Sequence, residues 1–200
     1  MDDCCHDDDV NKVLIEHKST LWAVLLINLA MFFVEGISSY FAQSTALLAD
    51  SLDMLSDAAI YGVTFYAIGK GPIVEAKVSL LKGTMMGVLG VAVLIQALLR
   101  FFSTEVPVAE TISVVSTLAL VANLICALLL LRHRNDNLNM RSVWLCTRND
   151  VLANIGVLCA SGLVFWFQSR IPDLVVGVVI ALMVIKSATS VVAESRAALK

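Results

Sequence analysis

Apolar residues are gathered into six long runs, and short polar segments separate one run from the next. Each run holds at least 20 residues. An α-helix rises about 1.5 Å per residue, so every run can cross the roughly 30 Å hydrocarbon core of a bilayer. The pattern therefore predicts an all-α, polytopic membrane protein with six transmembrane helices. The predicted spans cover residues 19–41, 45–68, 78–102, 108–131, 142–167 and 173–192.

Lysine and arginine are distributed unevenly between the two sets of connecting segments. The terminal tails and the loops 69–77 and 132–141 carry nine of them, whereas the opposite loops carry only Arg100 and Arg170. Cytoplasmic segments are enriched in these residues, so both termini are expected in the cytoplasm, with the protein in the inner or plasma membrane. We expect an N-terminal tail (1–18), a six-helix membrane domain (19–192) and a short C-terminal tail (193–200).

Composition supports a membrane protein and argues against several other classes. Of the 200 residues 58% are hydrophobic and 16% charged, and the mean hydropathy is +0.84. A soluble domain is nearer 45–50% apolar and about 25% charged. The net charge of −3 comes without a basic patch, so nucleic acid is not an expected partner. The five cysteines do not form a disulfide framework, and the short loops leave little room for an enzyme's catalytic site or a bound cofactor.

Ionisable and polar side chains interrupt three of the predicted spans. A charge at the bilayer centre costs about 2.5–3.5 kcal/mol or more, so such residues usually face the interior of a helix bundle and pair with one another. Residues three, four or seven apart share a helix face, which groups these side chains within each span. Protons, a cation or both must compensate the acids. The residues are Asn28 and Glu35 in the first span, Asp50, Asp53 and Asp57 in the second, and Cys146, Asp150 and Asn154 in the fifth.

Packing the second span against the fifth would bring four candidate ligands together: Asp53, Asp57, Cys146 and Asp150. Three carboxylates and a thiol suit tetrahedral Zn²⁺, and the sulfur favours thiophilic ions such as Zn²⁺ and Cd²⁺ over Mg²⁺ and Ca²⁺. The ligands must lose protons to bind, so metal entry would expel protons and metal–proton exchange follows. We expect Asp50 to lie beside these ligands and to support them without binding the metal itself. For Glu35, Asn28 and Asn154 we keep two interpretations, a structural hydrogen-bonding network and a proton path.

The spacing of these residues resembles that of the cation diffusion facilitator family over nearly the whole chain. The resemblance implies a homodimeric transporter that exports Zn²⁺ or related metals in exchange for protons, with Asp53, Asp57, Cys146 and Asp150 at the family's ligand positions. Position 146 is cysteine where many zinc-transporting relatives have histidine, and no segment after residue 192 corresponds to the family's C-terminal cytoplasmic domain. The matching residues are Asn28-x3-Phe32-x2-Glu35, Ser44-x5-Asp50-x2-Asp53-x3-Asp57 and Trp144-x-Cys146-x3-Asp150-x3-Asn154.

Three alternatives stay open at this point. The same ligands could serve an exporter of Fe²⁺, Co²⁺ or Mn²⁺. The acids could instead be structural, in a membrane metal sensor or assembly subunit that transports nothing. The N-terminal Cys4-Cys5-His6 segment could be a simple acidic tail or a cytoplasmic arm that captures metal.

Overall fold

The computed structural model describes the backbone of residues 18–67, 72–131 and 138–199. All regular structure in these ranges is helical, which confirms the predicted all-α fold. Side chains lie outside the described part at positions 18, 60, 61, 63–67, 72, 75 and 138–149. The helices are α2 (Lys18–Ala42), α3 (Thr45–Ala67), α4 (Pro72–Phe101), α5 (Ala109–Leu131), α6 (Leu138–Phe167) and α7 (Ile171–Ala198).

Three helices extend further than the apolar runs that predicted them. α4 begins at Pro72 and α6 at Leu138, both within predicted polar loops, and α7 continues past residue 192 to Ala198. Hydropathy marks the part of a helix inside the bilayer, whereas backbone hydrogen bonds can continue into water. Proline is favoured in a first helical turn because the N–H that it lacks would have no helical partner there. Most of the predicted C-terminal tail is therefore the end of α7.

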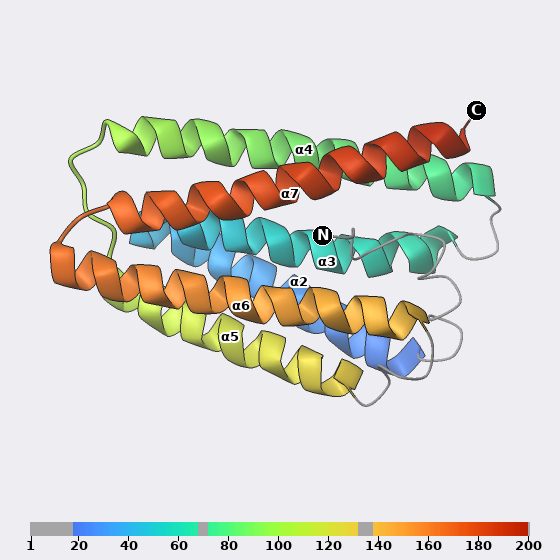
Figure 1. Cartoon of the computed structure of the whole chain (residues 1–200), viewed down its shortest axis with the longest axis horizontal. Coiled ribbons are helices and arrows are strands. Elements are labelled where there is room, and N and C mark those ends of the chain that lie inside the picture. Colours follow the sequence, from blue (N-terminus) through green and yellow to red (C-terminus); the bar gives the residue numbers. More distant parts are fainter. Residues whose placement is uncertain (1–17, 68–71, 132–137, 200) are drawn as a thin grey trace.

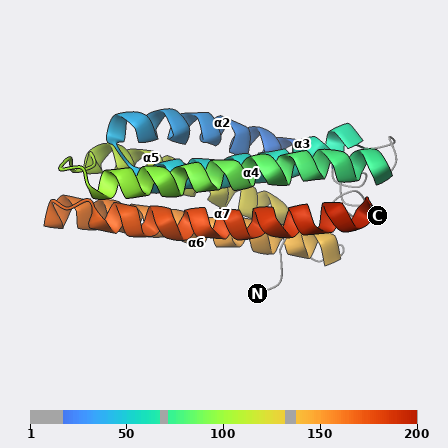
Figure 2. The same ribbon diagram turned by 90° about the horizontal axis from the view of Figure 1, so that it is seen from above.

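The six helices form a bundle in which α3 is the central element. It packs against α2, α4, α6 and α7, while α5 packs against α2 and α6. α4 and α7 lie side by side (Figures 1 and 2). α2 begins and α7 ends at one end of the bundle, on the right in Figure 1. The opposite end is formed by residues 42–45, 101–109 and 167–173, and we call it the capped end.

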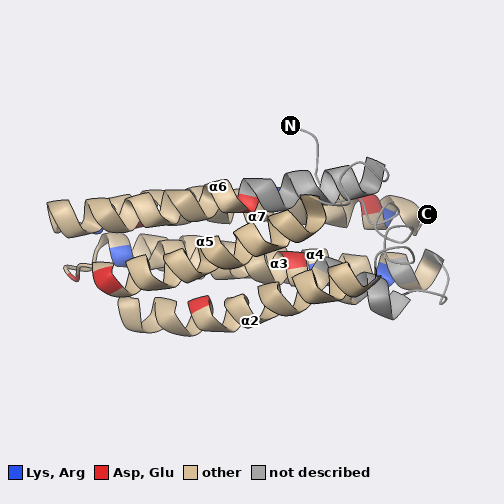
Figure 3. Cartoon of the chain, turned by 90° about the horizontal axis from the view of Figure 1, so that it is seen from below, with Lys and Arg blue, Asp and Glu red and all other residues tan. Residues whose placement is uncertain are grey.

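The outer surface of the bundle suits a lipid environment. Within the described residues, α2, α4, α5, α6 and α7 are long and apolar enough to cross a membrane. α3 has the same 23-residue length as α5 but carries three aspartates in eight residues, and the other helices surround it. Large apolar side chains point outward, such as Phe33 and Trp166, which are 56% and 82% exposed. Figure 3 shows long stretches of helix without a charged residue.

Small residues allow the helices to approach closely, as is common in membrane bundles. Ala42, Ala46 and Ala49 of the α2–α3 segment are buried in one cluster with Ala181 and Ala188 of α7. The interior therefore combines short side chains and tight backbone approach with the polar groups described next.

Candidate functional site

The polar centre of the bundle begins with the acidic face of α3, which consists of Asp50, Asp53 and Asp57. Asp50 is 1% exposed, and the other two are half-buried. Asp53 interacts electrostatically with both Asp50 and Asp57, so the three carboxyl groups follow one another along the helix. Such a row in a membrane interior requires neutralisation by protons or cations.

Glu35 of α2 lies beside this face, level with Asp50. It is completely buried, and its carboxyl group interacts with Asp50 and Asp53 across the α2–α3 interface. Asn28, seven residues earlier, is also buried, but its Nδ2 donates to the Val24 carbonyl of its own helix at 3.0 Å. The structure thus brings Glu35 together with the acids of α3, whereas the Asn28 amide is hydrogen-bonded to the backbone of its own helix.

α6 supplies the acid on the other side. Asp150 is half-buried and interacts directly with Asp57 across the α3–α6 interface. Asn154, fully buried one turn later, donates from Nδ2 to the Asp150 carbonyl at 3.0 Å. Cys146 lies on α6 one turn before Asp150, and its side chain is outside the described part.

Two further groups reach Asp57 from other helices. Lys82 of α4 is only 6% exposed and interacts electrostatically with Asp57. Cys126 of α5 is buried and also interacts with Asp57. Sequence reasoning missed Cys126 as part of this region because no ligand type recurs at helical spacing on its own helix. Lys82 stands in an apolar stretch of the sequence, and the structure shows its positive charge beside an acid.

Side chains of α4, α5 and α6 therefore all interact with Asp57 of α3. Among the described residues, no three histidine, cysteine, aspartate or glutamate side chains are close enough to hold a metal ion together. The fourth predicted ligand, Cys146, is outside that search, so the four-residue cage stays a prediction. The Cys4-Cys5-His6 segment also lies outside the described residues.

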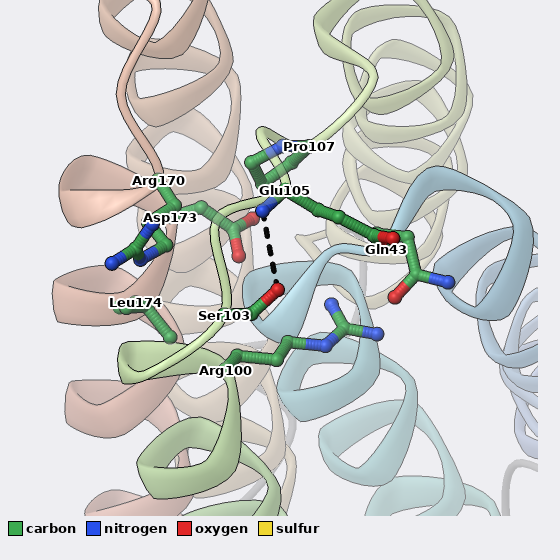
Figure 4. A pocket seen from close by; sticks show the side chains of 8 residues that line it. All are labelled: Gln43, Arg100, Ser103, Glu105, Pro107, Arg170, Asp173 and Leu174. Atoms are coloured by element: carbon green, nitrogen blue, oxygen red, sulfur yellow. Dashed lines mark hydrogen bonds between the residues drawn. The ribbon is translucent and has the colours of Figure 1, made fainter.

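A second buried polar cluster closes the capped end. The Asp173 carboxylate at the start of α7 accepts hydrogen bonds from the Ser44 hydroxyl and from the backbone N–H of Thr45, the latter at 2.6 Å. A small pocket beside it is lined by charged and polar side chains from three connections (Figure 4). Sequence reasoning missed this cluster because an acid in a first turn is ordinarily assigned to its own helix. The lining residues are Gln43, Arg100, Ser103, Glu105, Pro107, Arg170, Asp173 and Leu174.

The sequence also matches a known protein family over most of its length. Residues 21–72 and 74–199 match the family described as the cation efflux transmembrane domain. The chain belongs to the cation efflux family. Its members, the cation diffusion facilitators, are transporters, and the chain is an integral multi-pass membrane protein.

Individual relatives are distant but cover most of the chain. It is 24% identical to the cadmium, cobalt and zinc/H(+)-K(+) antiporter of Bacillus subtilis (strain 168), over 86% of this chain and 61% of that protein. It is 25% identical to the zinc transporter ZitB of Pectobacterium atrosepticum, over 90% of this chain and 60% of that protein. The probable zinc transporter MSC2 of Saccharomyces cerevisiae is 26% identical, over 91% of this chain and 28% of that protein. The chain spans about three fifths of the length of the two bacterial relatives.

Proposed function

We propose that this cation efflux family member exports divalent transition metals, Zn²⁺ and Cd²⁺ first, in exchange for protons. The observation that carries the proposal is the interaction of Asp57 on α3 with Asp150 on α6 in the interior of a membrane bundle. Two acids from different helices that lie this close in a low-dielectric interior need a positive charge between them. The names of the relatives, two zinc transporters and a cadmium, cobalt and zinc antiporter, support the choice of metals.

In the proposed cycle, Asp53, Asp57, Cys146 and Asp150 hold the metal as substrate. Binding releases protons from these groups, and protons return when the metal leaves on the other side. Lys82 supplies one fixed positive charge beside Asp57, so the acids do not depend on protons alone when no metal is bound. Alternate access to the two sides then makes metal and protons move in opposite directions.

For orientation, we propose that the end carrying Lys18 and Ala198 faces the cytoplasm and that the capped end faces away from it. The distribution of lysine and arginine in the sequence supports this arrangement. We also propose that the chain acts as a homodimer, which cross-linking in native membranes would test by the appearance of a species of twice the monomer mass.

Flux through proteoliposomes that contain the purified chain tests transport. A pH gradient, acid inside, should drive uptake of Zn²⁺ and Cd²⁺, and Asp57→Asn and Asp150→Asn should each reduce it roughly tenfold or more, since each removes a charge that pairs with the cation. Glu110→Gln is the matched control, because Glu110 is an exposed acid in the first turn of α5. Normal flux in both site variants would refute the site, and no flux in the wild type would favour a sensor or assembly subunit.

Metal preference needs its own experiment, because Fe²⁺, Co²⁺ and Mn²⁺ fit the same carboxylates. The Cys146 thiolate favours soft ions, so Cys146→His should weaken Cd²⁺ transport more than Zn²⁺ transport. Competition among the five metals in wild type and variant measures this preference. Equal losses for Cd²⁺ and Zn²⁺ would remove the argument from sulfur.

A further inference from the structure

The N-terminus of α3 is held by a side chain from a distant part of the sequence. The first backbone N–H groups of a helix have no partner within the helix, and they carry a partial positive charge. In α3, the N–H groups of Thr45 and Ala46 donate to Asp173 at 2.6 and 3.4 Å, and the N–H of Leu47 donates to the Ser44 hydroxyl oxygen at 3.0 Å. Ser44 in turn donates its hydroxyl proton to Asp173. One carboxylate of α7 and one serine thus satisfy three successive N–H groups.

This contact is buried and tightly fitted. Ser44 and Thr45 are fully buried and Asp173 is 1% exposed, so water does not replace these bonds. One turn further along α7, a Cβ placed on Gly177 would lie 2.7 Å from the Thr45 carbonyl carbon and 2.9 Å from the Ala46 nitrogen. The backbone of α7 therefore rests directly on the first turn of α3. We call this contact, formed by Ser44, Thr45, Ala46, Asp173 and Gly177, the α3–α7 clamp.

The surrounding connections reinforce the clamp. The Arg100 guanidinium at the end of α4 interacts electrostatically with Asp173, and Figure 4 places both beside the same pocket. Arg170 donates to the Phe101 carbonyl at 2.9 Å, and the N–H of Val108 donates to the Ala42 carbonyl at 2.9 Å. All three connections at the capped end are thus tied together.

We propose that Asp173 is a positioning residue for metal transport, acting through the clamp on the acidic face of α3. Asp50, Asp53 and Asp57 all lie on the helix whose first turn Asp173 holds, whereas α7 contributes no described acid to the region around Asp57. The clamp fixes the rotation and height of α3 against α7, and so the direction in which its acids face. This inference rests on the transport function proposed above.

Kinetics of the full chain in proteoliposomes test it, with Cd²⁺ as the probe. Asp173→Asn keeps the size of the side chain but weakens its acceptance of three hydrogen bonds, and it should lower kcat for Cd²⁺ at least tenfold while KM stays within about threefold. Ser44→Ala should lower kcat several-fold, Ser44→Thr should restore it, and the double variant should match Asp173→Asn alone. Ser116→Ala is the control, since the Ser116 hydroxyl bonds within its own helix to Ile112 and Ser113. Wild-type kcat in Asp173→Asn, or additive losses in the double variant, would overturn the proposal.

A second measurement separates this inference from the transport function itself. Hydrogen–deuterium exchange of the purified chain should become faster in Asp173→Asn over residues 44–48 and 171–178, and unchanged in Ser116→Ala. Unchanged exchange over residues 44–48 would overturn the clamp whatever the flux. Faster exchange there, together with a wild type that moves no metal, would establish the clamp as a structural contact and overturn both its positioning role and the transport proposal.

Discussion

Replacing Gly177 with alanine tests how closely α7 rests on α3. The new methyl carbon would lie 2.7 Å from the carbonyl carbon, 2.8 Å from the carbonyl oxygen of Thr45 and 2.9 Å from the Ala46 nitrogen. These are backbone atoms of a helix, so they cannot move aside as the tip of a flexible side chain can. Alanine in a helix interior is otherwise more favourable than glycine by about 0.8–1 kcal/mol. The sign of the effect therefore depends on whether the cost of the contact exceeds this gain.

Overpacking a well-fitted core typically costs about 1–3 kcal/mol, and moving α7 away from α3 would also lengthen the bonds to Asp173. A hydrogen bond to a charged group contributes about 1.5–3 kcal/mol, so weakening even one of them adds to the loss. We expect Gly177→Ala to reduce the free energy of unfolding by about 1.5–5 kcal/mol, the sum of these costs less the gain from alanine.

The control for this substitution is a glycine of α4 that packs loosely against α7. A Cβ on Gly87 of α4 would meet the Cβ of Ala188 at 3.7 Å, an ordinary van der Waals distance. Gly87→Ala should therefore leave the stability unchanged or raise it by up to about 1 kcal/mol. Thermal and denaturant unfolding of the purified protein in detergent, followed by circular dichroism, measures both variants. A Gly177→Ala protein as stable as the wild type, or an equal loss in Gly87→Ala, would refute the close approach described here.

Three other substitutions address the buried polar groups. Lys82→Met should raise the affinity for Cd²⁺ roughly tenfold in calorimetric titration, because a fixed positive charge beside Asp57 repels the incoming ion, and Lys82→Arg should not; equal affinity in all three proteins would contradict this. Glu35→Gln should raise the melting temperature without metal, since it removes a carboxyl group whose charge is disfavoured first by complete burial and then by the neighbouring Asp50; a lower melting temperature would show that the carboxyl group is needed. Ser161→Ala removes a 2.9 Å hydrogen bond to α5 and should cost about 0.5–1.5 kcal/mol of stability while Cd²⁺ affinity stays unchanged; a weaker affinity would place this bond in the binding region.

Hydropathy predicted the helices well because each one must cover a bilayer with apolar side chains. It placed the start of α4 and the end of α7 less well, since helical hydrogen bonding continues where apolar character stops. The spacing of Asp53 and Asp57 on α3 and of Asp150 on α6 was enough to expect facing acids, because residues four apart share a face whatever the tertiary structure. The interaction of Asp57 with Asp150 is the part of this expectation that the structure describes.

The interactions of Lys82 and Asp173 could not be predicted from residue spacing. The partner described for each comes from another helix or connection: Asp57 for Lys82, and Ser44 for Asp173. Spacing carries information about one helix only, so a pair formed across two helices becomes visible only when the packing is known. Ser44 gave a partial signal, since serine is a favoured residue just before a helix. The sequence contained nothing to say that Asp173 would share in that cap.

Distances measured from the clamp along α3 locate the three aspartates on the path proposed for a metal ion. Asp50, Asp53 and Asp57 lie six, nine and thirteen residues after Ser44, or about 9, 14 and 20 Å along the axis of α3. In the proposed cycle, an ion between Asp57 and Asp150 is thus about 20 Å from the first turn of α3. Asp53 and Asp50, with Glu35 beside Asp50, continue the acidic surface toward the capped end. That surface ends at the buried bonds around Asp173, which occupy the last stretch before the connections. In the proposed cycle, the acids would give the ion a path of about 20 Å along α3, and the clamp would lie between the end of that path and the connections of the capped end.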